Sequence, residues 1–168
     1  IVHELGNVYS NDSGRAVRMI GTVQDVTEQR QKDYELKKLS MTIEQSVNLI
    51  FITDTKGVIE YVNPMFEKIT GYSSKDALGQ TPRILSSGEV TDHEYKEMWT
   101  TILSGRTWRG SYKNKKKDGD YYWCSTVITP IRDERGRITN FLAVQEDETL
   151  KRFSEERIRY LAHHDELT

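Results

Sequence analysis

Asn114 is the polar side chain whose place in the chain points most directly to a binding site. Side chains alternate between the two faces of a strand, so a strand over residues 107–114 puts Trp108, Tyr112 and Asn114 on one face. The aromatic residues direct this face to the core, which leaves the Asn114 amide in an apolar space. An unpaired amide there costs about 1–3 kcal/mol, and the polar edge of a heteroaromatic ligand would pair it. Asn114 could instead bond the backbone of the turn at Asp118-Gly119.

Short strands and short helices between residues 47 and 149 must position this amide. Asn63-Pro64 predicts the N-cap and first residue of a short helix over residues 65–69. Apolar residues at spacings of three and four predict a longer helix over residues 92–103. The predicted strands cover residues 49–53, 58–63, 107–114, 121–130 and 138–145. This order predicts an α+β fold, with a five-stranded antiparallel sheet and short helices on one face.

The chain contains an internal repeat, because residues 14–27 align without gaps to residues 136–149, at an offset of 122 residues. Each copy is predicted to be a turn, an apolar strand and an Asp-x-Thr that starts a charged helix. The identical pairs are Gly14/Gly136, Arg15/Arg137, Asp25/Asp147 and Thr27/Thr149. We therefore expect residues 1–27 to be the C-terminal end of one domain and residues 47–149 to be a complete second copy.

Residues 28–46, between the two copies, are predicted to form a linker helix. They contain no glycine or proline and carry Leu36, Leu39 and Ile43 as a single apolar stripe on a polar helix. The stripe suits pairing with a second helix, as in a coiled coil, and equally suits packing on its own domain.

Six motifs occur in a fixed order between residues 44 and 149. They are Tyr61-Val-Asn-Pro-Met-Phe66, Ile69-Thr-Gly-Tyr72, Gly79-Gln-Thr-Pro-Arg-Ile-Leu85, Trp108-Arg-Gly110, Asn114-Lys-Lys-Lys-Asp-Gly119 and Asp147-x-Thr149. Their residues and order resemble the PAS domain with its closing PAC motif, a sensory fold of bacterial signalling proteins. Residues 81–123 are most similar to the NifL-like subgroup, some of which bind FAD. The resemblance implies a PAS fold between N- and C-terminal signalling helices, with a ligand site between sheet and helices.

The flavin-binding LOV branch of the PAS family implies roles for individual residues. In that branch, amides at the positions of Asn114 and Gln145 bond the polar edge of the isoalloxazine ring. A second asparagine of the branch falls at Cys124, so one contact is missing, and the photoreactive cysteine falls at Pro82, which excludes a cysteinyl–flavin adduct there. The candidate cofactor-binding residues are Asn114, Gln145, Trp108, Trp99 and Cys124.

Other interpretations of the pocket stay open. Trp108 and Trp99 could stack on a cofactor or simply pack in the core, and Cys124 suits a small buried hydrophobe. The pocket could hold FAD, as in the NifL-like subgroup, or an unknown metabolite, or be empty. Haem-binding PAS domains take a histidine from the long helix, where His93 lies near the required position. The other histidines, His3, His163 and His164, lie outside the domain and are not spaced to bind a metal ion together with its residues.

Residues 160–168 resemble the entry into GGDEF domains, in which a segment of the form A-x-H-D-x-L-T leads into the cyclase fold. The resemblance implies that residues 150–168 are a linker helix and the start of a GGDEF domain, and that the parent protein is a diguanylate cyclase that makes cyclic di-GMP. The alternatives are a ligand-free structural PAS dimerisation domain and a PAS sensor of another output, such as a histidine kinase. No catalytic motif occurs in the chain, so we expect no enzyme activity in this fragment.

Charge and patterning set the expected partners. The 168 residues carry a net charge of −2, which favours neither nucleic acid nor an anionic membrane as a partner. No apolar run approaches the roughly 18 residues that span a bilayer, so we expect a cytoplasmic setting without membrane contact in this segment. If Gln145 faces the pocket, Leu142 and Val144 face outward and need a cover. We expect a homodimer through the flanking helices and this outer sheet face.

Overall fold

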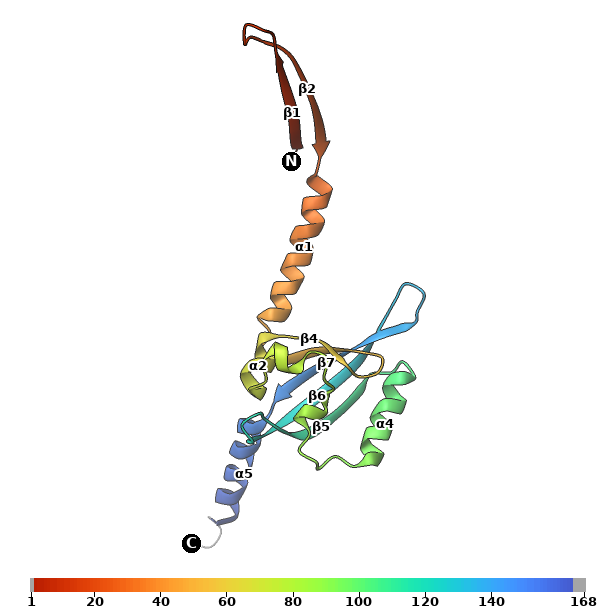
Figure 1. The fold of residues 1–168 in the computed structure, drawn as a ribbon. Coiled ribbons are helices and arrows are strands. Elements are labelled where there is room, and N and C mark those ends of the chain that lie inside the picture. The colour runs from red at the N-terminus through yellow and green to blue at the C-terminus, as the bar shows by residue number, and fades with distance from the viewer. Residues whose placement is uncertain (1, 165–168) are drawn as a thin grey trace. The chain divides into compact units, whose positions relative to one another are not determined.

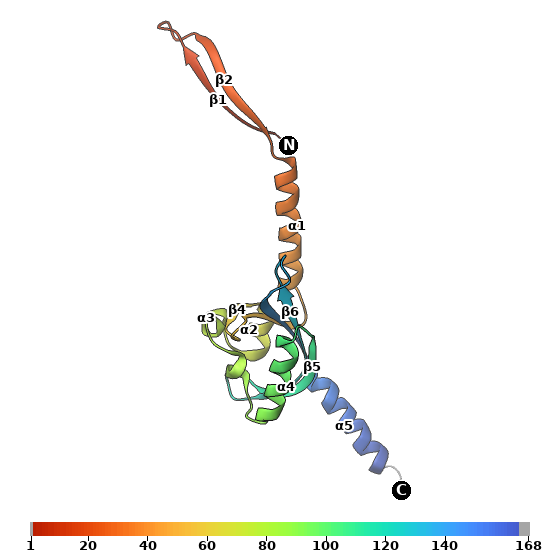
Figure 2. The same cartoon turned by 90° about the vertical axis from the view of Figure 1, so that its right-hand side faces the viewer.

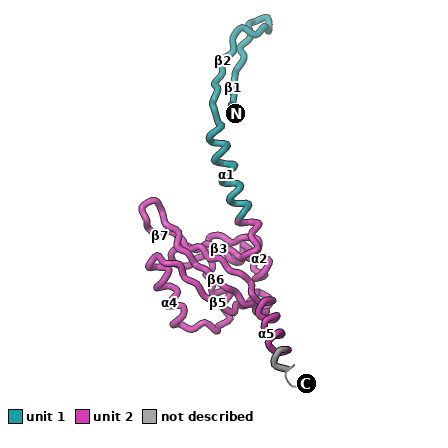
Figure 3. The backbone as a smooth tube through the Cα atoms, turned by 180° about the vertical axis from the view of Figure 1, so that it is seen from behind, with its two compact units in different colours: residues 1–42 teal, residues 43–168 magenta. Residues whose placement is uncertain are grey.

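The computed structural model describes residues 2–164 and divides the chain into two units, residues 1–42 and 43–168 (Figure 3). The first unit contains the antiparallel hairpin of β1 (Val2–Ser10) and β2 (Ala16–Asp25). Helix α1 (Thr27–Glu44) follows and has no buried residue. Helix α1 begins one residue before the start of the predicted linker helix, residues 28–46, and ends two residues before its predicted end.

The second unit is built on one five-stranded antiparallel sheet in the order β4-β3-β7-β6-β5 (Figure 1). Its strands begin within one residue, and end within two, of the predicted positions. They are β3 (Leu49–Asp54), β4 (Ile59–Val62), β5 (Trp108–Lys115), β6 (Tyr121–Arg132) and β7 (Ile138–Asp147). The predicted five-stranded sheet is confirmed.

Helices cover one face of this sheet, which we call the inner face (Figures 1 and 2). Helix α2 packs on β3, α4 on β5 and β6, and the 3₁₀ turn η1 on β5. Phe51 and Ala143 of the sheet bury against Phe66, Ala77 and Leu85 of the helices, so the core lies between these two layers. The covering elements are α2 (Pro64–Thr70), α3 (Ser74–Ala77), η1 (Pro82–Leu85) and α4 (Asp92–Leu103).

Asn63 starts α2 as predicted and also ties α2 to its neighbours. Its fully buried side-chain oxygen accepts from the backbone N–H of Phe66 at 3.0 Å and of Ile50 at 2.9 Å. Its amide nitrogen donates to the carbonyl oxygens of Asn48 at 2.9 Å and Ile43 at 3.3 Å. Because every bond goes to backbone, this one side chain fixes where α2 begins relative to β3.

Helix α4 has the predicted bounds, residues 92–103. Thr91 caps it with a reciprocal pair of bonds, in which the Thr91 side chain accepts from the Glu94 N–H and the Glu94 carboxylate accepts from the Thr91 N–H. Met98 and Ile102 are buried on the side that faces the sheet. The cap and this apolar face explain why the sequence forms a helix here.

The hairpins β1–β2 and β6–β7 repeat each other at the offset of 122 residues found in the sequence. Val2 pairs with Asp25 as Cys124 pairs with Asp147, and the same offset holds along both ladders. Asn11 and Asp133 close the two turns with their side-chain oxygens. The sequence repeat is therefore also a repeat of register and of turn.

Helix α5 (Thr149–His164) leaves directly from β7. The Thr149 N–H donates to the Asp147 carboxylate at 2.9 Å, and the Thr149 hydroxyl accepts from the Trp123 N–H at 2.9 Å. The Arg152 guanidinium lies over the Trp123 ring at 4.3 Å. These contacts join the first turn of α5 to β6. The last four residues of the predicted GGDEF entry lie outside the described residues.

Candidate functional site

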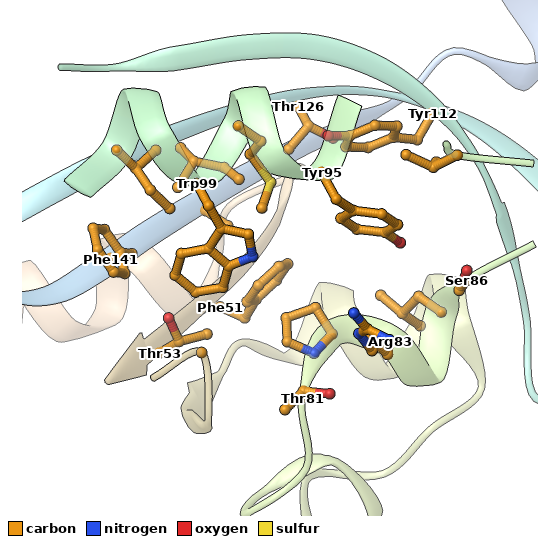
Figure 4. Close-up of a pocket in the computed structure, with 18 of the residues that line it drawn as sticks. Phe51, Thr53, Thr81, Arg83, Ser86, Tyr95, Trp99, Tyr112, Thr126 and Phe141 are labelled. Atoms are coloured by element: carbon orange, nitrogen blue, oxygen red, sulfur yellow. The ribbon is translucent and has the colours of Figure 1, made fainter. Parts of the chain in front are cut away.

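A cavity of about 390 Å³ lies between the inner face of the sheet, helix α4 and the η1 turn (Figure 4). Aromatic and other apolar side chains form much of its wall. Trp99 packs edge to face on Phe141 at 5.9 Å between ring centroids, and Phe51, Tyr95 and Met98 complete this apolar part. Trp99 therefore lines the cavity. A planar, largely apolar ligand suits walls of this kind.

Gln145 brings a polar atom to the sheet side of the cavity. It is 5% exposed, pairs with Thr126 across the β6–β7 ladder, and lines the cavity together with Thr126. Its side-chain oxygen is buried and has no hydrogen-bond partner among the described residues. Gln145 therefore faces the cavity, which is the condition under which Leu142 and Val144 were expected to face outward. The unpaired oxygen accepts a bond only from a molecule that enters the cavity.

Asn114 also lines the cavity, but its amide nitrogen is already engaged. The nitrogen donates to the Tyr122 hydroxyl at 3.3 Å and to the Cys124 sulfur at 3.4 Å. The turn at Asp118-Gly119 is closed by backbone bonds instead, which removes the alternative role for this side chain. Asn114 therefore has its amide oxygen left for a ligand.

Two predicted site residues lie outside the cavity wall. Cys124 is fully buried behind Asn114, and burial raises the pKa of its thiol. Trp108 is half-buried and stacks on Tyr112 at 5.1 Å, which it can do because Gly110 between them has no side chain. Trp108 and Cys124 therefore contact residues that line the cavity, Tyr112 and Asn114, and direct contact of either with a ligand stays a prediction.

Three further residues of the wall were missed as site residues by the sequence reasoning. Tyr112 was placed on the correct strand face but not proposed as a contact, and Lys56 and Arg83 come from a turn and from η1. The Arg83 guanidinium lies 5.7 Å from the centre of the Tyr95 ring. Lys56 and Arg83 are cationic and no carboxylate stands among the lining residues of the described chain, so the cavity favours an anionic group. Turn positions carry no periodic signal, so only the fold shows that Lys56 and Arg83 line the same cavity.

The geometry gives no support to haem ligation by His93. His93 is exposed at the start of α4 and does not line the cavity. Among the described residues, no group of three or more His, Cys, Asp or Glu side chains could hold a metal ion.

A protein-family model described as the PAS fold matches residues 37–147. The chain belongs to the PAS family. As a PAS domain it is a sensory module of a signalling protein, not a catalytic one. Residues 47–149, predicted to be the domain from sequence motifs, lie within this match except for the last two. No helix in the described part of the chain is long and apolar enough to cross a membrane.

Known PAS proteins include clear relatives of the chain. It is 38% identical over 117 residues to a nitrogen fixation regulatory protein of Klebsiella oxytoca, covering 70% of this chain and 24% of the relative. It is 31% identical over 111 residues to phototropin-1A of Oryza sativa subsp. japonica, covering 66% of this chain and 12% of that one. A solved PAS domain of a Colwellia psychrerythraea protein superimposes with a TM-score of 0.63 at 28% identity, covering 68% of this chain and 98% of that domain. The chain thus spans about a quarter or less of its curated relatives.

Proposed function

We propose that the PAS domain binds a flavin nucleotide in its cavity and regulates a downstream diguanylate cyclase. The unpaired, buried side-chain oxygen of Gln145 carries the ligand part of the proposal. Such an oxygen costs about 1–3 kcal/mol in an empty protein, and a ligand N–H would recover that cost. The imide edge of a flavin presents such an N–H beside carbonyl oxygens.

The rest of the cavity fits the same ligand class. Trp99, Phe51 and Met98 suit a flat aromatic body, while Arg83 and Lys56 suit the phosphate of a flavin nucleotide. Pro82 lines the cavity where a reactive cysteine would stand, so no covalent adduct forms at that position. When bound, the flavin would supply redox or light-dependent chemistry. The protein residues hold and orient it.

Signal transmission would follow β7 into α5. Gln145 lies two residues before Asp147, whose carboxylate accepts from the Thr149 N–H at the start of α5. Thr149 and Arg152 are also bonded to or stacked on Trp123 of β6. A change in the hydrogen bonding of Gln145 shifts β7 and so changes the first turn of α5.

Residues 160–168 resemble the entry into GGDEF domains, and this sequence motif supports diguanylate cyclase as the output. Cyclic di-GMP synthesis by the full-length parent protein, measured with the flavin oxidised and reduced, tests this choice. A histidine kinase activity in the parent, without cyclic di-GMP synthesis, would contradict it.

We also propose that residues 1–27 are the last hairpin of a preceding PAS domain, and that the chain is a cytoplasmic homodimer. The shared register and turns of β1–β2 and β6–β7 support the first point. Apolar, half-exposed residues on the outer face of the sheet support dimerisation, as does the apolar stripe of Leu36, Leu39 and Ile43 on α1. The outer-face residues are Ile50, Ile52, Val127, Leu142 and Val144.

The experiment that tests ligand binding is an absorbance spectrum of the purified 168-residue chain, with mass spectrometry of small molecules released by denaturation. The proposal predicts a flavin spectrum and a released flavin nucleotide. A colourless protein that releases no small molecule and takes up no added flavin would favour a structural PAS dimerisation domain instead.

A further inference from the structure

Two buried side-chain oxygens have no hydrogen-bond partner in the described chain, and both belong to residues of the same cavity wall. They are the Gln145 side-chain oxygen and the Tyr112 hydroxyl. Buried polar groups in native proteins are almost always paired, so two orphans at one cavity point to a molecule that pairs both. Gln145 already has a role in the proposed function, whereas Tyr112 has none.

The Tyr112 hydroxyl acts as a hydrogen-bond donor in this environment. Burial raises the pKa of Tyr112 well above its ordinary value of 10.0, with smaller contributions from the charges of neighbouring groups. The phenol therefore keeps its proton throughout the physiological range and can donate it to an acceptor. The Gln145 oxygen, in contrast, only accepts.

The Tyr112 ring is held in place by its own strand. Trp108 stacks on it at 5.1 Å with the two planes 13° apart. A Cβ atom on Gly110, between them, would lie only 2.1 Å from the Trp108 indole. The absence of a side chain at position 110 thus lets Trp108 lie along the strand and support Tyr112.

The Tyr112 hydroxyl lies near the Thr126–Gln145 pair of the β6–β7 ladder. Figure 4 shows the Tyr112 hydroxyl directed toward Thr126, and Thr126 pairs with Gln145 on the next strand. Tyr112 itself lies opposite Cys124, which is two residues before Thr126 on β6. The Tyr112 hydroxyl, a donor, and the Gln145 side-chain oxygen, an acceptor, can therefore both bond one ligand edge that carries an N–H beside a C=O.

We propose that Tyr112 determines ligand specificity by donating its hydroxyl to the acceptor of an N–H/C=O edge whose N–H is bonded by Gln145. Trp108 is then a positioning residue, because it acts through Tyr112. The inference rests on the proposed function and narrows the ligand to planar molecules with adjacent donor and acceptor atoms. The Tyr112 hydroxyl would also supply a polar contact to the ligand, whereas Cys124 does not line the cavity.

The test is Tyr112→Phe in the full 168-residue chain, with Tyr121→Phe as the matched control. Tyr121 is an exposed tyrosine on β6, so its variant removes a hydroxyl without touching the cavity. FMN, FAD and riboflavin are the probes, and ligand-free unfolding in urea is the second readout. We expect Tyr112→Phe to weaken FMN and riboflavin alike by about 10-fold, the loss of one buried hydrogen bond. Ligand-free stability should be unchanged or raised, because an unpaired buried hydroxyl is removed.

The outcomes separate the two proposals. If the wild-type chain binds FMN and Tyr112→Phe binds it equally well, the role of Tyr112 is overturned and the flavin proposal stands. If the wild-type chain binds none of the three probes, the flavin proposal fails. The urea measurement then decides on Tyr112, since a loss of ligand-free stability would show a structural hydroxyl and overturn the inference, and unchanged or raised stability supports it.

A double-mutant cycle tests the positioning role of Trp108. Gly110→Ala displaces the indole without removing it, so FMN binding should weaken in the wild-type background. In the Tyr112→Phe background the same substitution should have little further effect, because the hydroxyl that it misplaces is gone. Equal losses in both backgrounds would show that Trp108 acts independently of Tyr112, and would overturn its positioning role.

Discussion

At the residue scale, the amides of Asn114 and Gln145 illustrate what strand alternation predicts and what it leaves open. Alternation places both on the inner face because their strands have a clear buried side. It does not reveal that the Asn114 nitrogen is bonded to Cys124 and Tyr122, because those contacts cross from β5 to β6. Nor does it show that Trp108 lies along its strand, a position that depends on Gly110.

Asp76 provides a test of local electrostatics at this scale. Its pKa is lowered from 3.8 to about 2, first by the hydrogen bond from Lys117 and then by bonds from Ser73. A lowered pKa means that the ionised carboxylate stabilises the folded state above pH 3.8 and that this contribution is lost as pH falls through about 2. Asp76→Asn should therefore lower stability near neutral pH and flatten its decline between pH 4 and pH 2.

The measurement for Asp76 is the urea unfolding midpoint across that pH window. Glu134→Gln, at an exposed carboxylate in the β6–β7 turn, is the matched control and should run parallel to the wild type. A parallel curve for Asp76→Asn would contradict the assigned ion pair with Lys117, which is 2.7 Å long.

At the scale of elements, periodicity and caps predicted the five strands and helices α2 and α4, and missed α3 and η1. Helix α4 matches its predicted bounds because it combines an apolar stripe with well-defined ends. Helix α3 has only four residues, too few for a periodic signal, although Ser73 and Asp76 form a capping box that a search for caps alone would have found. The η1 turn likewise has only Pro82 as a marker.

Asn63 should be among the most sensitive positions of the fold. Asn63→Ala removes an N-cap and leaves buried backbone groups of Ile50 and Asn48 unpaired, so we expect a loss of about 2–4 kcal/mol in unfolding free energy. Asn63→Asp keeps the acceptor oxygen and should cost less. Urea denaturation measures both, with the exposed Asn7→Ala as control. A cost below about 1 kcal/mol for Asn63→Ala would show that water replaces the side chain.

The junction of β7 and α5 should respond to loss of one hydroxyl. Thr149→Val keeps the side-chain shape and removes the acceptor of the Trp123 N–H. We expect faster hydrogen exchange at the Trp123 amide, by about 10-fold, and in the first turn of α5, because that bond protects the junction. Ser154→Ala, further along α5, is the control. Unchanged exchange at Trp123 would argue against this route for the signal.

At the scale of the whole molecule, the outer face of the sheet is the feature that calls for a partner. Val144 lies between Ile50 and Val127 on this face. Val144→Glu should shift the chain from dimer to monomer in sedimentation velocity, because it places a charge in an apolar contact. Ser111→Glu, on the exposed part of edge strand β5, should leave the dimer intact. A wild-type monomer would contradict the proposed homodimer, and an unchanged dimer in Val144→Glu would show that the interface lies elsewhere.

The relation between the two hairpins also belongs to this scale. The sequence repeat predicted the turn and strand of residues 14–27, and the structure adds a shared register at an offset of 122 residues. Sequence could not supply the cavity of the second unit, because Lys56, Arg83 and Tyr112 converge there from three distant segments. Motifs thus identify the fold, while the ligand class depends on tertiary geometry.

The flavin content of the purified chain tests whether the PAS cavity holds a flavin nucleotide through Gln145. Wild type and Gln145→Leu should be purified side by side, incubated with FMN and FAD, and compared by absorbance after removal of free ligand. We expect close to one bound flavin per wild-type chain and at least about a 10-fold weaker binding in Gln145→Leu, with no loss of ligand-free stability. Absence of flavin from the wild-type chain under these conditions would contradict it.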